Sequence, residues 1–251
     1  MEADGRPGSA QSIGAQRLLS TVTALIPAYN EEDNIGATIA AVRRISSVDE
    51  IVVVDDGSSD KTADEARAAG ADKVISLERN KGKGAALEAG IHAASGDVLL
   101  FVDADLGESA SHAFALVQAV LSDEADMAIA MLPAVQTKSG SKSGGFGLVI
   151  RLARWGIRRL GGRAMKAPLS GQRALRREAL GQSPRLDRGF GIEVGLTIDA
   201  LRAGYRVQEI PTPLTHRATG RDIKGFFHRG RQFVDVMLAI LRRLSARRAL
   251  R

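Results

Sequence analysis

The sequence predicts an α/β fold in which a mostly parallel β-sheet is flanked by helices. Short runs rich in Val, Ile and Leu alternate with segments of helical periodicity through the first half of the chain. These runs have no polar face, which is typical of strands that helices cover on both sides. The length of 251 residues suits one large domain of this kind.

The first half holds the expected strands and helices in strict alternation. The expected strands cover residues 21–28, 50–56, 72–77, 97–105 and 125–131. The expected helices cover residues 33–44, 60–69, 83–94 and 110–122.

The second half begins with a different composition. Residues 136–147, QTKSGSKSGGFG, predict a flexible cationic loop. The segment 146–163 has apolar residues at helical spacing and arginines on another face, so we expect a basic amphipathic helix. After the segment LSGQRALRREAL at 169–180, we expect a helix at 190–203, a strand at 205–211 and a closing helix at about 222–245.

These elements are expected to form one domain at 21–245, with one half at 21–135 and the other at 136–245. Residues 1–20 lack the apolar core of a signal peptide and are expected to be a flexible leader, and 246–251 a basic tail. No apolar run approaches the length of a membrane-spanning helix. We therefore expect a cytoplasmic protein.

The net charge of +6 hides an asymmetry between the two halves. Residues 1–135 hold 10 Lys/Arg and 22 Asp/Glu, whereas residues 136–251 hold 25 and 7. The basic half suits an anionic substrate, a membrane surface or nucleic acid. Aromatic residues are only 4% and no nucleic-acid recognition motif is present, so no nucleic-acid partner is expected. The lack of cysteine excludes disulfides, thiolate zinc sites and a cysteine nucleophile.

Two aspartates, Asp103 and Asp105, close the apolar run GDVLLFVDAD. Residues two apart in a strand point to the same side, so both carboxylates can face one site. Paired carboxylates repel unless a cation neutralises them, and hard oxygen ligands suit Mg²⁺ or Mn²⁺ that also binds phosphates. Solvated acids in a turn are the alternative. Polar loops after two earlier strands favour the metal site, because ligands bind at the carboxyl ends of such strands.

Other polar residues could contact a ligand at the same edge. Asp55 and Asp56 end a strand, where a carboxylate can accept a hydrogen bond from a base or a ribose. Lys81 and Lys83 lie beside a helix N-terminus, an arrangement that favours a diphosphate, although solvated lysines are the alternative.

Two residues of the second half are further candidates. His216 follows a strand and precedes Arg217, so it is a candidate phosphate or metal contact, with a solvated loop histidine as the alternative. Glu193 begins an otherwise apolar helix, where it can complement the helix dipole or bind a sugar hydroxyl.

Taken together, these motifs resemble family 2 glycosyltransferases of the GT-A fold. IPAYNEEDNI (26–35), EIVVVDDGSSDKT (50–62), NKGKGAALEAG (80–90) and LLFVDADL (99–106) occur in the family's order. SGQRAL (170–175) and GFGIEVGLTIDALRAGYRVQEIPTPLTHRATG (189–220) resemble the later part of polyprenyl-phosphate glycosyltransferases.

The resemblance implies a hexosyltransferase that uses a UDP- or GDP-linked sugar with Mg²⁺ or Mn²⁺. Asp103 and Asp105 would be the family's DxD motif and the catalytic residues, and His216 would join them at the metal. The residues implied to bind the nucleotide are Pro27, Ala28, Tyr29, Asn30, Glu31, Asp55, Asp56, Lys83, Asp103 and Ala104. Those implied to bind the acceptor or the sugar are Ser170, Gly171, Gln172, Arg173, Glu193 and Arg217.

The sequence departs from the family pattern at two points. Gly107 stands where relatives often carry a polar side chain, so one metal ligand is missing, and Glu108 is a candidate replacement. No acidic pair that could serve as a general base stands out, which is tolerable for a phosphate acceptor because that group is already an anion.

The expected acceptor is a phosphate-bearing molecule, with polyprenyl phosphate as the first choice. The segment 146–163 could then lie at the inner membrane face with Trp155 at headgroup depth, whereas a helix packed on the sheet is the alternative. A soluble acceptor, as in enzymes of the glucosyl-3-phosphoglycerate synthase type, is the second choice. A non-catalytic module that binds a membrane or a partner is the third.

Overall fold

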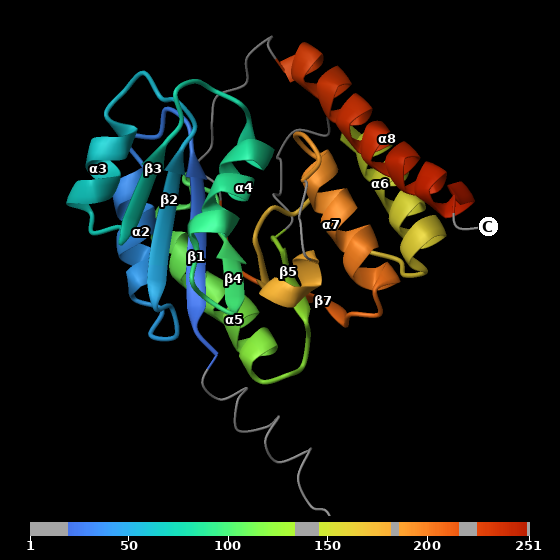
Figure 1. Cartoon of the computed structure of the whole chain (residues 1–251), viewed down its shortest axis with the longest axis horizontal. Coiled ribbons are helices and arrows are strands. Elements are labelled where there is room, and N and C mark those ends of the chain that lie inside the picture. The colour runs from blue at the N-terminus through green and yellow to red at the C-terminus, as the bar shows by residue number, and fades with distance from the viewer. Residues whose placement is uncertain (1–19, 134–145, 182–185, 216–224, 250–251) are drawn as a thin grey trace, which may run out of the picture.

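The computed structural model describes residues 20–133, 146–181, 186–215 and 225–249, with side chains except at 146, 225–231 and 246–249. Most of the expected leader, nearly all of the loop at 136–147, and residues 250–251 lie outside this description. Within it, the chain forms one seven-stranded sheet with helices on both faces (Figure 1). The α/β fold predicted from the sequence is therefore confirmed.

The sheet has the strand order β3-β2-β1-β4-β6-β5-β7. All neighbours pair in parallel except at β6, which runs antiparallel to both β4 and β5. The strands are β1 (Val22–Ala28), β2 (Glu50–Asp55), β3 (Lys73–Ser76), β4 (Val98–Phe101), β5 (Met127–Met131), β6 (Arg173–Arg176) and β7 (Val207–Pro211).

Two differences from the expected strands bear on function. The segment around β6 was not predicted to be a strand, since its sequence RALR is only four residues long and has a charged residue at each end. The strand β4 ends at Phe101 rather than at residue 105, so Asp103 and Asp105 belong to the turn that follows it.

Helices cover both faces of the sheet. The helices are α2 (Ile35–Arg43), α3 (Thr62–Ala68), α4 (Lys83–Ala93), α5 (Phe114–Leu121), α6 (Phe146–Gly161), α7 (Gly191–Arg202) and α8 (Gly225–Ala249), with the 3₁₀ helices η1 (Gly107–Ala113) and η2 (Arg177–Leu180). The expected basic tail begins inside α8, which continues to Ala249.

The core lies in two layers because side chains alternate along each strand. Val22, Ala24 and Ile26 of β1 pack with α2, α3 and α5 on one face. Leu25 of the same strand packs on the other face, with α4, α6, α7 and α8 (Figure 1). Burial of these apolar residues contributes most of the favourable free energy of folding.

The basic amphipathic helix α6 packs against α7 and α8. Val149, Ala153 and Ile157 are fully buried, and a Cβ on Gly156 would lie 2.3 Å from the Ile240 side chain of α8. The buried face of α6 is thus filled by the protein, while Trp155 on the other side is 53% exposed. Among the described residues, no helix is long and apolar enough to cross a membrane.

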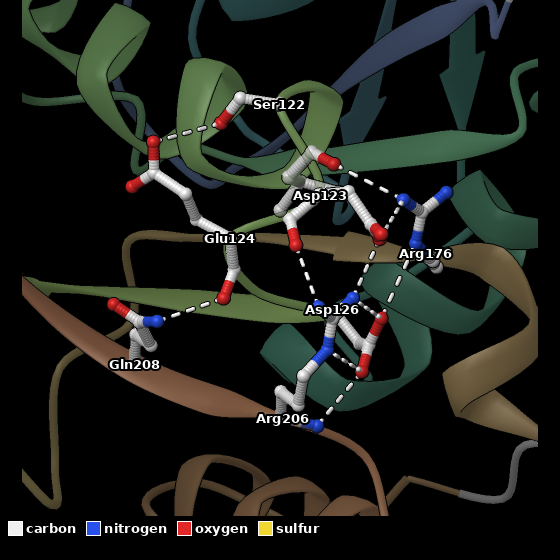
Figure 2. A network of polar contacts seen from close by, with 8 residues as sticks. Ser122, Asp123, Glu124, Asp126, Arg176, Arg206 and Gln208 are labelled. Atoms are coloured by element: carbon white, nitrogen blue, oxygen red, sulfur yellow. Dashed lines mark hydrogen bonds and ion pairs between the residues drawn. The ribbon is translucent and has the colours of Figure 1, made fainter. Parts of the chain in front are cut away.

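The edge of the sheet at the amino ends of the parallel strands is held by a charged network (Figure 2). Arg206 donates to both carboxylate oxygens of Asp126, at 2.8 and 3.1 Å. Arg176 and Arg206 both donate to Asp123, whose backbone has φ of +62°. The hydrogen bonds from Arg206 lower the pKa of Asp126 to about 2. This network joins the starts of β5 and β7 to the end of β6.

Candidate active site

The candidate active site lies at the opposite edge of the sheet, where the parallel strands end. We call this the active edge. The loops after β1, β2 and β4 meet there, as expected for parallel strands of one sheet. The antiparallel strand β6 contributes its beginning to the same edge, since Arg173 pairs with Phe101 at the end of β4. Segments far apart in the sequence are therefore brought together.

The loops after β1 and β2 are tied to each other by hydrogen bonds. The Asn30 backbone N–H donates to Ser58 Oγ at 2.9 Å, and the Ser59 N–H donates to Asn30 Oδ1 at 2.9 Å. Asn30 has φ of +54°, a conformation that asparagine tolerates better than most residues. Beside it, Tyr29 is 47% exposed and its ring is accessible to a ligand.

Asp55 and Asp56 are both buried and both bound by backbone groups. Asp55 accepts from the Ser58 N–H, whereas Asp56 accepts from the N–H groups of Lys81 and Gly82 at 2.8 and 2.7 Å. Asp56 therefore fixes the segment before α4 to the end of β2. A direct contact of both carboxylates with a nucleoside, as the resemblance implied, remains a prediction.

The loop after β4 meets α4 and the beginning of β6 at Asp103. Lys83 Nζ pairs with Asp103 Oδ1 at 2.6 Å, and Gln172 Nε2 donates to Asp103 Oδ2 at 2.7 Å. Gly171 permits this approach, because a Cβ there would lie 2.6 Å from Lys83 Nζ. Both oxygens of Asp103 are thus engaged by the protein itself.

Below this contact lies a buried pair of opposite charges. Arg173 is 1% exposed and donates to the backbone oxygens of Ser170 at 2.6 Å and Glu193 at 3.3 Å. Glu193 is 4% exposed, and its Oε1 lies 3.6 Å from Lys83 Nζ. Its Oε2 is buried without a hydrogen-bond partner, as is Ser170 Oγ. An unpaired buried carboxylate oxygen is costly, so a ligand donor at this position would be favourable.

These charges shift one another's pKa values. Burial lowers the pKa of Arg173 to about 10, although Glu193 and Asp103 partly oppose this. Burial alone would lower the pKa of Lys83, but the charges of Asp103 and Glu193 outweigh it and raise that pKa. Lys83 therefore stays protonated and keeps a positive charge beside the two acids.

Acidic side chains also gather across the edge from Lys83. Burial raises the pKa of Glu31, and the negative charges of Asp105, Asp60 and Asp103 raise it further, whereas a hydrogen bond from Asn34 opposes the shift. Carboxylate oxygens at this density fit a hard divalent cation. Among the described residues, no three His, Asp or Glu side chains are close enough to hold a metal ion by themselves. His216 and Arg217, predicted to contact the metal and the acceptor, lie outside the described residues.

Two residues near the DxD turn act differently from what the sequence suggested. Glu108, the candidate extra ligand, forms an ion pair with Arg44 on α2, so the structure gives no support to that role. Gly107 has φ of +53°, and this backbone conformation explains a glycine where relatives often carry a polar residue.

Sequence reasoning missed Thr38, which holds the DxD turn from below. This fully buried side chain donates to the Ala104 oxygen at 2.7 Å and accepts from the Gly107 N–H at 2.9 Å. The signal was present, because a threonine interrupts the apolar face of α2 beside Ile35 and Ile39. Its partners could not be deduced from periodicity.

Comparison with known proteins identifies a sequence family. The model described as glycosyl transferase family 2 matches residues 23–181, well over half of the chain. The glucosyl-3-phosphoglycerate synthase of Mycolicibacterium paratuberculosis is 33% identical over 77% of this chain and 64% of its own length. The undecaprenyl-phosphate 4-deoxy-4-formamido-L-arabinose transferase of Pectobacterium carotovorum is 41% identical over 35% of this chain and 30% of its own. The chain thus spans less than two-thirds of either relative.

Solved structures show a similar fold. The crystal structure of glucosyl-3-phosphoglycerate synthase from Mycobacterium tuberculosis with Mn²⁺, UDP and glucosyl-3-phosphoglycerate has a TM-score of 0.70 and 28% identity, covering 96% of this chain and 86% of that one. A structure of the same enzyme with Mg²⁺ and UDP has a TM-score of 0.71, 28% identity, and coverage of 95% and 84%. This likeness confirms the GT-A fold implied by the sequence motifs.

Proposed function

This chain belongs to glycosyl transferase family 2, and we propose that it transfers a sugar from a nucleoside-diphosphate sugar to a phosphate-bearing acceptor in a metal-dependent reaction. The observation that carries the proposal is the partly buried cluster of Lys83, Asp103, Gln172, Arg173 and Glu193 at the carboxyl edge of the sheet. Two cations and two acids are positioned there before any ligand binds, with Glu193 Oε2 still unpaired. Such preorganisation is what stabilisation of a charged leaving group requires.

The residues at this edge would have different roles in the reaction. The nucleoside would lie against the loops after β1 and β2, with the exposed Tyr29 ring beside the base. Asp103 would hold Lys83 and Gln172 in place through the hydrogen bonds that it accepts from both. Asp105 is the better candidate for direct contact with Mg²⁺ or Mn²⁺, since both oxygens of Asp103 are engaged. When bound, such a metal ion supplies a Lewis acid that stabilises the departing diphosphate.

Glu193 would orient the donor sugar. Its Oε1 lies 3.6 Å from Lys83 Nζ, and its buried Oε2 has no hydrogen-bond partner. A sugar hydroxyl that donates to Oε2 would satisfy the unpaired atom, whereas a sugar without a hydroxyl there would leave it unsatisfied. Specificity built on a buried acceptor of this kind discriminates strongly.

The acceptor that the relatives favour is a soluble phosphorylated molecule of the phosphoglycerate type. The relative that covers most of this chain is named for that reaction, and solved structures of the Mycobacterium tuberculosis enzyme contain phosphoglyceric acid with UDP-glucose. We therefore place UDP-glucose and a phosphoglycerate first. The positive charge that Lys83 keeps at this edge suits the phosphate of this acceptor.

A polyprenyl phosphate is the second candidate acceptor. The shorter match to undecaprenyl-phosphate transferases supports it, as does the outer face of α6. There Leu148 and Trp155 are exposed beside the exposed Arg151 and Arg158, a pattern that suits an anionic membrane interface. The two candidates differ chemically, because a phosphate nucleophile needs no base and a hydroxyl nucleophile must lose a proton.

The deciding experiment measures product formation with purified protein. UDP-glucose and GDP-mannose are each incubated with Mn²⁺ or Mg²⁺ and with either 3-phosphoglycerate or undecaprenyl phosphate, and the products are identified by mass spectrometry. We expect a glucoside of 3-phosphoglycerate from UDP-glucose. A sugar linked to the lipid phosphate would instead establish the second candidate.

The role of Asp105 is tested in the same assay. Asp105→Asn should lower turnover by roughly a hundredfold or more, because the metal-stabilised leaving group is lost. The exposed Asp33 on the same side of the molecule provides a matched control, and Asp33→Asn should keep full activity. Full activity of Asp105→Asn would refute the metal role. No binding of any donor by calorimetry would favour a non-catalytic module.

A further inference from the structure

A cavity of about 790 Å³ lies beside the active edge. It is bounded by the N-terminus of α4, the segment that precedes α7 and the described part of α8, which lie on one face of the sheet (Figure 1). We call it the basic pocket, and its polar lining includes Arg79, Lys81, Lys83, Arg188 and Gln232. Of the nucleotide and metal residues discussed above, Lys81 and Lys83 line it and the others do not.

The basic pocket carries an excess of available positive charge. Arg79, Lys81 and Arg188 are exposed, and none forms an ion pair within the part of the chain that the structure describes. The wall also holds carboxylates, but these are engaged. Asp187 is paired with Arg242 at 2.8 Å and Arg243 at 2.6 Å, and Asp235 also has a partner.

One further acid lies on α4 inside this lining. Glu88 accepts a hydrogen bond from the Leu186 N–H at 2.5 Å, which fixes the wall of the pocket rather than its centre. The cations from two separate segments, before α4 and before α7, therefore line the same half-open pocket. An anion in that space would be attracted from two sides.

The helix α4 adds backbone donors to this charge. Its preceding N–H groups at Lys81 and Gly82 are taken by Asp56, but those of Lys83 and Gly84 belong to the first turn and have no carbonyl partner inside the helix. The loop comes close at this point, since a Cβ on Gly84 would lie 2.6 Å from the Asp187 oxygen. Helix N-termini of this kind favour anions such as phosphate.

An independent observation comes from α8. Gln232 lines the same pocket and is only 7% exposed. Its Oε1 is buried without a hydrogen-bond partner. A buried amide oxygen left unpaired costs free energy, and a hydroxyl group of a bound molecule can satisfy it. The pocket thus offers cations for a phosphate and an acceptor for a hydroxyl.

We infer that the basic pocket binds a phosphate monoester that also carries a hydroxyl group, such as a glycerol phosphate, at a site separate from the nucleotide. The phosphate would contact Arg79, Lys81 and Arg188, and the hydroxyl would donate to Gln232 Oε1. A free metabolite and a lipid headgroup share this chemistry. The pocket is linked to the candidate active site by Lys83, whose Nζ reaches Asp103, and by the N–H groups of Lys81 and Gly82, which donate to Asp56. Binding requires neither donor nor metal, so the inference stands apart from the proposed transfer.

Calorimetry tests this binding without donor and without metal. Glycerol 3-phosphate and inorganic phosphate are titrated into the full-length protein. We expect saturable binding of both, with glycerol 3-phosphate the tighter. Arg188→Gln should weaken both by about tenfold or more, since a charged hydrogen-bonded contact is lost. Gln232→Leu should weaken glycerol 3-phosphate by about tenfold and leave inorganic phosphate unchanged. Arg159→Gln, on the exposed face of α6, is the matched control and should change neither.

Two further arms locate the site and identify the source of the phosphate. Saturating UDP with Mn²⁺ should leave glycerol 3-phosphate binding intact. Co-sedimentation of the protein with vesicles of phosphatidic acid in phosphatidylcholine, compared with phosphatidylcholine alone, reports whether the pocket also accepts a lipid headgroup. If the protein binds the phosphatidic acid vesicles and Arg188→Gln abolishes this binding, the site also accepts lipids. Melting curves of each variant verify that it is folded.

Four results would overturn the inference. The first three are no saturable binding of glycerol 3-phosphate, displacement of glycerol 3-phosphate by UDP, and equal losses of binding in Arg188→Gln and the Arg159→Gln control. Binding that persists unchanged in Arg188→Gln and Gln232→Leu would likewise place the phosphate elsewhere.

Discussion

Gly171 lies where any side chain would touch the lysine at the centre of the active edge. A Cβ there would lie 2.6 Å from Lys83 Nζ and 3.3 Å from Asp103 Oδ2. The ammonium group is the far end of a flexible chain, so it can move aside without disturbing the backbone. Gly171 therefore determines where the Lys83 ammonium group lies, and it has little effect on the stability of the fold.

Gly171→Ala is expected to lower kcat/KM by roughly tenfold, because Lys83 can no longer sit against Asp103. The free energy of unfolding should change by less than about 1 kcal/mol. Kinetics with the established donor and urea unfolding measure the two effects.

The matched control for this variant is Gly36→Ala in α2. The nearest atom to a Cβ there is 3.9 Å away, on Ala69, which is an ordinary contact. Replacing a helical glycine with alanine should stabilise the protein by about 0.5–1 kcal/mol without changing activity. A Gly171→Ala enzyme that is as active as Gly36→Ala would contradict the positioning role.

Residue-scale prediction from sequence succeeded where the residue type states its own chemistry. Lys83 and Asp103 were expected to bind the nucleotide, and Gln172, Arg173 and Glu193 the acceptor or the sugar. The structure brings these residues together, and their roles stay predictions. Prediction from sequence failed where the backbone conformation determines which residue type is present. The positive φ of Gly107 cannot be read from a sequence, so a geometric requirement was interpreted as a missing ligand.

The element that contributes most to the assembly of the candidate site is the short strand β6. It runs against its neighbours, so its beginning lies where the parallel strands end. This reversal delivers Gln172 and Arg173 to the DxD turn. Four residues with an arginine at each end give too weak a periodicity to predict a strand, whereas the longer apolar runs of β1, β2 and β5 were found within two residues of their bounds.

The other end of β6 is anchored by the charged network at Asp126. The pKa of Asp126 is about 2 in the fold, below its ordinary value of 3.8, mainly because Arg206 donates to it. A depressed carboxyl pKa stabilises the fold above the unfolded value, and this contribution is lost as pH falls from about 4 through 2.

Asp126→Asn should therefore reduce the free energy of unfolding by about 1–3 kcal/mol at pH 7. The difference from the wild type should shrink as the pH is lowered towards 2, since the wild-type carboxylate is then protonated. Urea unfolding at pH 7, 4 and 2.5 measures this. Asp64→Asn, which removes an exposed pair with Arg67 on α3, should change stability little at any pH. If the difference in free energy of unfolding between the wild type and Asp126→Asn stays constant across the pH series, the Asp126 charge is not the cause of the lost stability.

At the scale of the whole molecule, the acidic and basic halves share a single sheet. β4 of the first half pairs with β6 of the second, and α8 at the end of the chain is tied by Arg243 to Asp187 and Asp199. The expectation that the two halves form one domain stays a prediction, and this shared sheet supports it.

We therefore predict one cooperative unfolding transition. Trp155 is the only tryptophan and lies on α6 in the second half, whereas circular dichroism at 222 nm reports helices of both halves. Midpoints from Trp155 fluorescence and from circular dichroism should coincide in urea. Two separated midpoints would mean that the halves unfold independently.

The placement of β6 also sets the order in which the protein can be assembled during synthesis. The strands β1 to β4 find all their mutual partners by residue 101, but both neighbours of β5 are made later. At a translation rate of roughly 5–20 residues per second, the apolar segment MAIAM waits about 2–8 s for residues 173–176 to be made. During that interval the Asp103 turn has no Gln172 beside it. The nascent chain thus carries an apolar strand without its neighbours, and its candidate active site is among the last parts of the molecule to be completed.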